Sequence, residues 1–368
     1  ENLVRACRYA ARHGLPRHAV ALALALRPAL DGGHDHDALA VHAAALDAAE
    51  RLAAPAPDPP EAGHPVGAEY AVGERERAIL RTAVGIASWR LGRHAAAAAA
   101  LGTAFEEHVR VGNADGAALA SAALGLVHDA QGRYRDAIEC QRRGLTVARA
   151  AGLRVAEATQ LINLGYGHIR LEQYDRAADQ YRQALTILAA EGERLGEAHA
   201  RAGLAACLEG LGRLDEALAL AEEAVTVYRT FGQTVYRLRT TATIGSIHRR
   251  LGRPADALHR LTEALRECRE LDNPRPTALI LNTLGEVYVD LREPGPALAS
   301  HADALALAQR IGDRWEHARA LVGLGDVHAG EAGRGDLDLA RGYWRQAYDL
   351  YGDPDLPAAR RVQARLAR

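Results

Sequence analysis

The sequence contains neither lysine nor methionine, and each absence narrows what the protein can do. All 45 basic residues are arginines, so the chain holds no phosphate-binding loop of the type G-x-x-x-x-G-K-[ST] and no lysine amine for Schiff-base chemistry. The chain also lacks an initiator methionine, and we therefore expect it to be a segment of a longer protein.

Paired cysteines, a charge excess and long apolar runs are missing as well. The four cysteines lie far apart without C-x-x-C spacing, which predicts free thiols in a reducing compartment rather than a disulfide framework or a zinc site. No run of about 18 apolar residues occurs, so we expect no membrane span. The formal charge of −2 argues against a chain built to hold nucleic acid or an acidic membrane. We therefore expect a cytoplasmic protein without direct nucleic-acid contacts.

What the sequence does contain is a helix-forming composition with an internal repeat. Alanine and leucine dominate, and aromatic residues make up only 5%, which favours helix. A small residue recurs every 40 positions, and a second one follows it by twelve, with a slip of three in the last repeat. The first set is Gly85, Gly125, Gly165, Ala205, Gly245, Gly285 and Gly325, and the second is Ala97, Ala137, Ala177, Ala217, Ala257, Ala297 and Ala340. We expect seven repeats, with an insertion around residues 331–338.

The repeat predicts stacked helical hairpins. A glycine inside a helix costs about 1 kcal/mol relative to alanine, so we expect each repeat glycine to allow a close helix–helix approach that offsets this cost. Turns such as "LGRH", "QGRY" and "LGRL" separate the two helices, and their glycine readily takes the left-handed conformation that ends a helix. One hairpin cannot bury its apolar stripe alone, so neighbours must stack into a continuous core.

This pattern resembles the tetratricopeptide repeat family. The residues of the third repeat that match the family's motif in order are Leu161, Leu164, Gly165, Ala177, Tyr181 and Ala184. His168 stands where the family usually has tyrosine. The resemblance covers about residues 75–351 and implies an all-α, right-handed superhelical solenoid of about seven hairpins, in a variant with a 40-residue repeat. Ala205 in place of glycine and the insertion in the seventh repeat depart from the motif.

The two ends fall outside the repeat. We expect residues 1–52 to form an N-terminal helical segment, residues 53–74 a proline-rich flexible loop, and residues 352–368 a C-terminal capping helix. The basic end of the last helix suits the polar outer face that a cap presents to water, and arginines there could also meet nucleic acid.

The opening residues carry a second resemblance. Asn2 and Leu3 at a helix start, then an A-x-x-x-G-L sequence and a helix pair leading into the repeats, are similar to a junction in actinobacterial regulators. In those proteins an ATPase module of the STAND or NB-ARC type precedes tetratricopeptide repeats, and many belong to the Streptomyces antibiotic regulatory protein class. The resemblance implies that any such ATPase lies outside this chain, because its phosphate loop needs a lysine.

Histidine is the residue type that most invites a chemical role. Four histidines share the repeat position three after the repeat glycine, where a row of imidazoles could respond to pH or bind metal; they are His128, His168, His248 and His328. Equivalent residues in stacked hairpins lie about 10 Å apart, whereas metal ligands converge within about 2 Å of one ion, so packing between helices is the favoured interpretation. The stretch "GGHDHD" at residues 32–37 predicts a solvated turn with an N-cap. With no catalytic signature present, we predict no catalytic residue, cofactor or metal, and no enzyme.

The remaining candidates lie on the first helix of each repeat, which lines the inner, concave face in tetratricopeptide arrays. The resemblance implies candidate binding residues at Trp89, Asn163, Tyr166, Arg170, His199, Arg239, Arg249, Asn282 and Glu286, with Ser246 and Asp326 at further inner positions. Asn163 matches an asparagine that often holds a bound peptide, and its amide can both donate and accept, although the equivalent positions of the other repeats lack it. Arg170, Arg239 and Arg249 can pair with the carboxylates of an acidic segment.

Together these features predict a non-catalytic sensor and protein–protein interaction module of a signalling or transcriptional regulator. Its partner would be a protein or a peptide, or the ATPase and effector region of the same full-length protein. A free-standing adaptor and a receptor for a peptide signal are the alternatives. A Walker motif upstream of Glu1 would favour the regulator, and an initiator methionine immediately before Glu1 would favour the adaptor.

Overall fold

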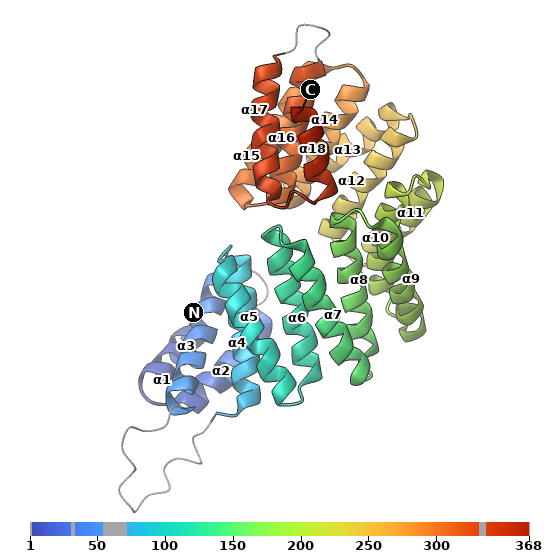
Figure 1. Ribbon diagram of the computed structural model, residues 1–368. Helices are drawn as coiled ribbons and strands as arrows, with labels where there is room; N and C mark the ends of the chain where they lie inside the picture. Colours follow the sequence, from blue (N-terminus) through green and yellow to red (C-terminus); the bar gives the residue numbers. More distant parts are fainter. Residues whose placement is uncertain (1, 31–33, 54–71, 331–335, 368) are drawn as a thin grey trace, which may run out of the picture. The chain divides into compact units, whose positions relative to one another are not determined.

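The computed structural model describes residues 2–30, 34–53, 72–330 and 336–367. Within these ranges the regular structure is entirely helical, in consecutive hairpins (Figure 1). The first nine helices are α1 (Asn2–Arg12), α2 (Pro16–Leu30), α3 (Asp35–Ala53), α4 (Glu74–Arg90), α5 (His94–Arg110), α6 (Ala114–Ala130), α7 (Tyr134–Ala150), α8 (Arg154–Arg170) and α9 (Tyr174–Glu191). The others are α10 (Arg194–Gly210), α11 (Leu214–Thr230), α12 (Thr234–Arg250), α13 (Pro254–Glu270), α14 (Pro274–Asp290), α15 (Pro294–Ile311), α16 (Arg314–Gly330), α17 (Leu337–Tyr351) and α18 (Pro357–Leu366).

The predicted all-α solenoid of helical hairpins is confirmed. The seven repeats run from α4 to α17, with α1 to α3 before them and α18 after them. Residues 54–71, from the predicted loop, and residues 331–335, from the predicted insertion, lie outside the described residues. No helix in the described ranges combines the length and the apolar character needed to cross a bilayer.

The turn between the helices of a hairpin follows from its glycine. Gly212 ends α10 with a φ of 80°, a conformation that glycine adopts without a steric penalty. The N–H of Gly212 donates to the carbonyl of Glu209 at 3.0 Å, and that of Arg213 to the carbonyl of Leu208 at 2.8 Å. This is the double hydrogen bond of a Schellman motif, and it satisfies carbonyls that the end of a helix leaves unpaired.

The repeat glycines allow the close approach that the sequence predicts. A Cβ on Gly165 would lie 2.6 Å from the ring of Tyr181, and one on Gly245 would lie 2.6 Å from Leu261. Each bulky side chain lies sixteen residues after its glycine, on the second helix of the same hairpin, and packs directly on the glycine's backbone. The same contact recurs in the pairs Gly85 with Leu101, Gly285 with His301 and, after the slip, Gly325 with Trp344.

The chain divides into two compact units. The N-terminal unit comprises Glu1–His128 and Glu139–Gln160, and the C-terminal unit comprises Asp129–Ile138 and Leu161–Arg368. In the N-terminal unit α1, α2 and α3 share an apolar core with α4, to which Cys7, Val41 and Leu80 contribute fully buried side chains.

The C-terminal unit closes on itself through an apolar contact. A cluster around its last helices contains Trp344 and Leu356 together with Tyr134, which begins α7, and Leu171 packs against the same cluster. The ring of Tyr134 meets the ring of Trp315 edge to face, with centroids 5.9 Å apart. The first and last segments of this unit are therefore in direct contact, although they are about 180 residues apart in sequence.

Ion pairs reinforce this closure. Arg361 of α18 donates two hydrogen bonds of 2.6 Å to the carboxylate of Glu172, which lies in the turn after α8. Arg135 at the start of α7 pairs with Asp353 in the turn before α18. We name this set of contacts, together with the Tyr134 cluster, the closing contact. It keeps the ends of the C-terminal unit together.

Candidate functional site

The first helices of the hairpins form the inside of the curve in the C-terminal unit. The helices α10, α12, α14 and α16 pack against one another in order, whereas within the described ranges the alternate helices α9, α11, α13 and α15 have no comparable mutual contacts. Helices that approach most closely lie on the inside of a curved stack. We call the surface of α10, α12, α14 and α16, together with residues 161–170 of α8, the inner face.

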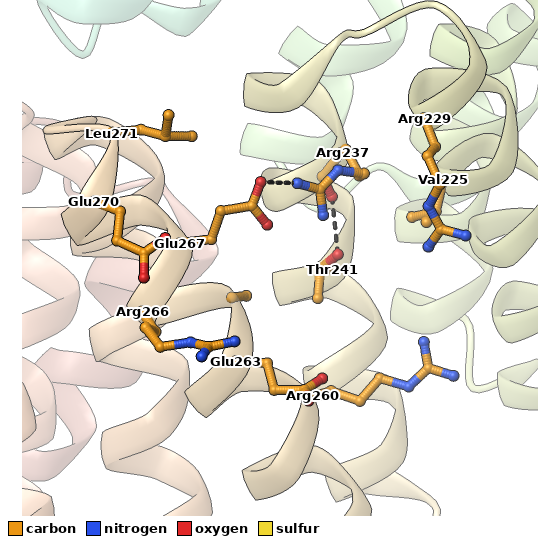
Figure 2. Close-up of a pocket in the computed structure, with 11 residues that line it drawn as sticks. Val225, Arg229, Arg237, Thr241, Arg260, Glu263, Arg266, Glu267, Glu270 and Leu271 are labelled. Atoms are coloured by element: carbon orange, nitrogen blue, oxygen red, sulfur yellow. Dashed lines mark hydrogen bonds and ion pairs between the residues drawn. The ribbon is translucent and has the colours of Figure 1, made fainter.

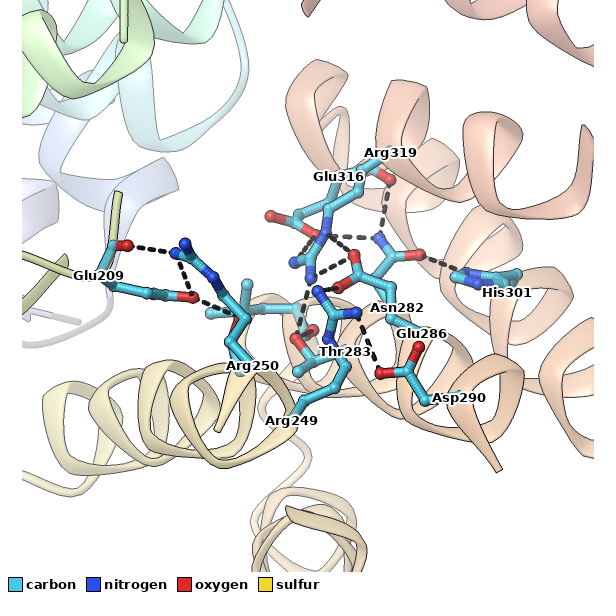
Figure 3. A network of polar contacts seen from close by, with 12 residues as sticks. Glu209, Arg249, Arg250, Asn282, Thr283, Glu286, Asp290, His301, Glu316 and Arg319 are labelled. Carbon is cyan, nitrogen blue, oxygen red and sulfur yellow. Dashed lines mark hydrogen bonds and ion pairs between the residues drawn. The ribbon is translucent and has the colours of Figure 1, made fainter. Parts of the chain in front are cut away.

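A network of ion pairs occupies the inner face of α12, α14 and α16 (Figure 3). At its centre the Oε1 atom of Glu286 accepts hydrogen bonds of 2.8 and 2.9 Å from Arg319, and Arg249 lies 3.3 Å from Oε2. Arg249 also pairs with Asp290 at 3.2 Å. Burial alone would raise the pKa of Glu286, but Arg319 and Arg249 outweigh burial and lower it. Glu286 and Arg249, both predicted as binding residues, are therefore engaged by the protein itself.

Asn282 lies beneath this network rather than on the surface. Its side chain is fully buried, and its amide nitrogen donates to Oε2 of Glu316 at 2.9 Å. The amide oxygen is left as the acceptor for Nδ1 of His301, at 3.2 Å. Its prediction as a binding residue needs correction, because one polar atom of this amide is used within its own hairpin and the other is used by the first helix of the next hairpin.

The His301 ring is enclosed by the backbones of two helices. A Cβ on Gly285 would lie 2.4 Å from the ring and one on Gly323 2.3 Å from it. Burial lowers the pKa of His301 to about 4. The imidazole therefore packs as a neutral ring.

Arg170, another of the three arginines predicted to bind carboxylates, lies against the closing contact. Its guanidinium stacks over Trp315, 4.3 Å from the ring centroid, hydrogen-bonds to the hydroxyl of Tyr166 and lies 3.5 Å from Asp129. Burial raises the pKa of Asp129 and the charge of Arg170 opposes that shift. Only 16% of the Arg170 side chain is exposed, so Arg170 and Tyr166 are also committed within the protein.

Arg239 differs from the other two arginines. It is exposed, and its guanidinium makes no ion pair or hydrogen bond with any described residue. It stands next to His199, whose pKa is lowered first by burial and then by the charge of Arg239. Burial raises the pKa of Tyr166 and of Tyr228, and the charge of Arg239 opposes both shifts.

Aromatic side chains surround His199 next to Arg239. The rings of Tyr228 and Tyr236 stack with centroids 5.7 Å apart, and His199 lies 4.3 Å from Tyr236 and 5.3 Å from Tyr228. The Nε2 atom of His199 is buried and has no hydrogen-bond partner among the described residues, so Nδ1 is the ring nitrogen that a ligand could reach. Asn163 of α8 is half-buried, and its amide makes no hydrogen bond with any described residue. Arg239, His199 and Asn163 are thus the predicted residues that keep hydrogen-bonding capacity for a ligand, and we call them the open set.

Trp89 belongs to the N-terminal unit, where it packs against the core cluster containing Ala97, Leu101 and Leu124. The histidines of the repeat position also pack locally. His168 and His248 are buried, and the ring of His328 stacks on Tyr343 at 5.8 Å. These contacts agree with packing between helices.

Sequence reasoning missed the partners that occupy two of the three arginines. Arg249 finds Glu286 and Asp290, which lie 37 and 41 positions further along the chain. A separation close to the repeat length places opposite charges on adjacent first helices, so a search for such pairs would have found them. The stacking of Trp315 on Arg170 had no comparable signal, because it depends on the closing contact.

The arrangement is that of a helical-repeat solenoid whose inner face is partly occupied by its own ion pairs. Its open set offers one positive charge, an imidazole and an amide beside stacked tyrosines, which suits hydrogen bonding to an extended segment rather than bond-making chemistry. Among the described residues, no group of three or more His, Cys, Asp or Glu side chains is placed to hold a metal ion.

Comparisons with known proteins identify the fold as a tetratricopeptide-like solenoid. The tetratricopeptide repeat model matches residues 156–230 and 236–310. The search of curated proteins gave no match. Among solved structures, the Rap conjugation gene regulator of the plasmid pLS20 in complex with the Phr* peptide gives a TM-score of 0.64 at 12% identity, covering 99% of this chain and 95% of that one.

Two further structures are similar. A Rap protein complexed with Competence and Sporulation Factor gives a TM-score of 0.60 at 12% identity, covering 95% of this chain and 96% of that one. A STAND protein with a tetratricopeptide repeat sensor from Pyrococcus horikoshii gives 0.51 at 13% identity, covering 90% of this chain and 49% of that one. At these identities the similarity concerns the fold.

Proposed function

We propose that the inner face of the C-terminal unit binds an extended peptide or protein segment that carries a carboxylate. The observation that carries this proposal is Arg239, an exposed guanidinium on the inner face without a partner among the described residues. A guanidinium forms two parallel hydrogen bonds with a carboxylate, and hydrogen bonds to charged groups contribute about 1.5–3 kcal/mol. His199 and Asn163 would orient the segment, and the exposed ring of Tyr236 would pack against its side chains.

The Phr* peptide named in the structure of the Rap conjugation gene regulator supports a segment as the ligand class, because that protein shares this fold. The wider role we propose is that of a sensor module in the cytoplasm. Its ligand would control an attached ATPase and effector region by binding one state of the regulator more tightly than the other. The STAND protein supports this role, since its repeat sensor belongs to a longer chain. A free-standing adaptor remains the alternative, and the upstream coding sequence distinguishes the two.

The test is a selection of random peptides on the immobilised protein. We expect acidic residues to be enriched among the selected peptides, and their affinity to fall at least about tenfold in the Arg239→Glu variant. Arg310→Glu is the matched control, because Arg310 is also exposed but lies on the second helix of a hairpin. Equal affinities for both variants, with helicity unchanged by circular dichroism, would contradict the proposal.

A further inference from the structure

A cleft lies between α11, α12 and α13 (Figure 2). It has a volume of about 580 Å³, and its lining includes the buried side chains of Val225 and Ala264. The α12 residues in it, Arg237 and Thr241, stand two positions before and two positions after Arg239. Two residues turn about 200° around a helix. The cleft therefore opens on the opposite side of α12 from Arg239.

The sequence of this cleft breaks the repeat. Arg260 stands where the preceding and following repeats have Leu220 and Ser300. Glu267 replaces an aliphatic residue, since the neighbouring repeats carry Val227 and Leu307. Long charged side chains thus stand at two positions where the preceding and following repeats carry uncharged ones.

The charges in the cleft are only partly satisfied. Arg237 hydrogen-bonds to Glu267, and Arg260 pairs with Glu222 at 2.6 Å. The guanidiniums of Arg229 and Arg266 make no ion pair or hydrogen bond with any described residue. Figure 2 shows these two side chains on different helices, on opposite sides of Thr241. Two unpaired positive charges therefore line one cleft.

We infer that this cleft binds an acidic segment of a partner protein, with one carboxylate at Arg229 and another at Arg266. Charge complementarity favours this occupant, because the two carboxylates would supply the counter-charges that these arginines lack. Glu263 and Glu270 also line the cleft, and their carboxylates can accept hydrogen bonds from N–H groups, which a peptide segment has and a small free anion lacks. A segment that is held at two points and donates its own N–H groups to those glutamates fits the lining better. The site is independent of the inner-face proposal, because it faces away from Arg239.

The test uses a fluorescent peptide with alternating glutamate and glycine, and its glutamine analogue as the competitor. Binding is followed by anisotropy in the Arg239→Glu background, which removes the positive charge proposed to bind a carboxylate on the inner face. We expect saturable one-to-one binding that weakens at least about tenfold in the Arg229→Gln/Arg266→Gln variant. The matched control, Arg176→Gln/Arg310→Gln, removes two other exposed arginines and should leave binding unchanged.

Three results would overturn this inference. They are the absence of saturable binding, equal weakening in the cleft and control variants, and displacement of the peptide by inorganic phosphate at the peptide's own concentration. The last result would show a simple anion site. Because all four arginines are exposed, loss of the fold does not confuse the outcome, and circular dichroism verifies this.

Discussion

Replacing Gly203 by alanine tests the reason for glycine inside these helices. Tyr181 is 2% exposed and lies between two glycines. A Cβ on Gly165 would come within 2.6 Å of its ring, and a Cβ on Gly203 within 2.1 Å. The substitution gains about 1 kcal/mol of helix propensity, and overpacking of the ring costs about 1–3 kcal/mol. Because 2.1 Å is far below van der Waals contact, we expect Gly203→Ala to lower the free energy of unfolding by about 2 kcal/mol.

The matched control is Gly342→Ala in α17, where a Cβ would meet nothing within 4 Å. There the propensity gain acts alone, and stability should rise by about 0.5–1 kcal/mol. Urea denaturation followed by circular dichroism measures both changes, and hydrogen exchange of peptides from α8 to α10 localises the effect. In a Tyr181→Leu background the cost of Gly203→Ala should shrink by at least about 1 kcal/mol. If Gly203→Ala stabilises the protein as much as Gly342→Ala does, the close-approach explanation is wrong.

Two further predictions concern the closing contact and the buried histidine. Arg361→Ala removes both hydrogen bonds to Glu172, and amide exchange in residues 129–138 should accelerate. Arg360→Ala, which removes only the local pair with Asp355, should not have this effect, and equal exchange in both variants would contradict the closing role. His301 stays neutral in the folded state down to about pH 4, whereas the unfolded chain protonates it near pH 6.5. The free energy of unfolding should therefore fall by about 1.4 kcal/mol per pH unit as the pH drops through that window. This contribution should be missing in His301→Phe, and identical pH slopes in the two proteins would refute the assignment.

Local repetition made most of the fold predictable. The 40-residue period located the hairpins, the turn glycines ended the helices, and the repeat glycines marked where a bulky side chain packs, because each of these depends on residues within one or two hairpins. The closing contact depends on the accumulated curvature of several hairpins. No local pattern indicates that Tyr134 will meet Trp315 or that Glu172 will meet Arg361.

The candidate site was predictable at the level of a face but not of individual side chains. The first-helix positions do form the inner face, yet a charged residue there can bind a ligand or the neighbouring helix. Arg249 pairs with Glu286, and Arg170 contacts Tyr166 and Trp315. Arg239 has no such partner among the described residues. The three arginines differ in which side chains of the adjacent hairpin lie opposite the guanidinium. The repeat position of an arginine does not predict those side chains.

The location of a bound segment tests the inner-face proposal most directly. A peptide selected on the protein would carry a benzophenone group, and the cross-linked residues would be identified by mass spectrometry. We predict cross-links in α8, α10 and α12 near Asn163, His199 and Arg239, and their loss in Arg239→Glu. Cross-links confined to α9, α11 or α13, unaffected by that substitution, would contradict the proposal.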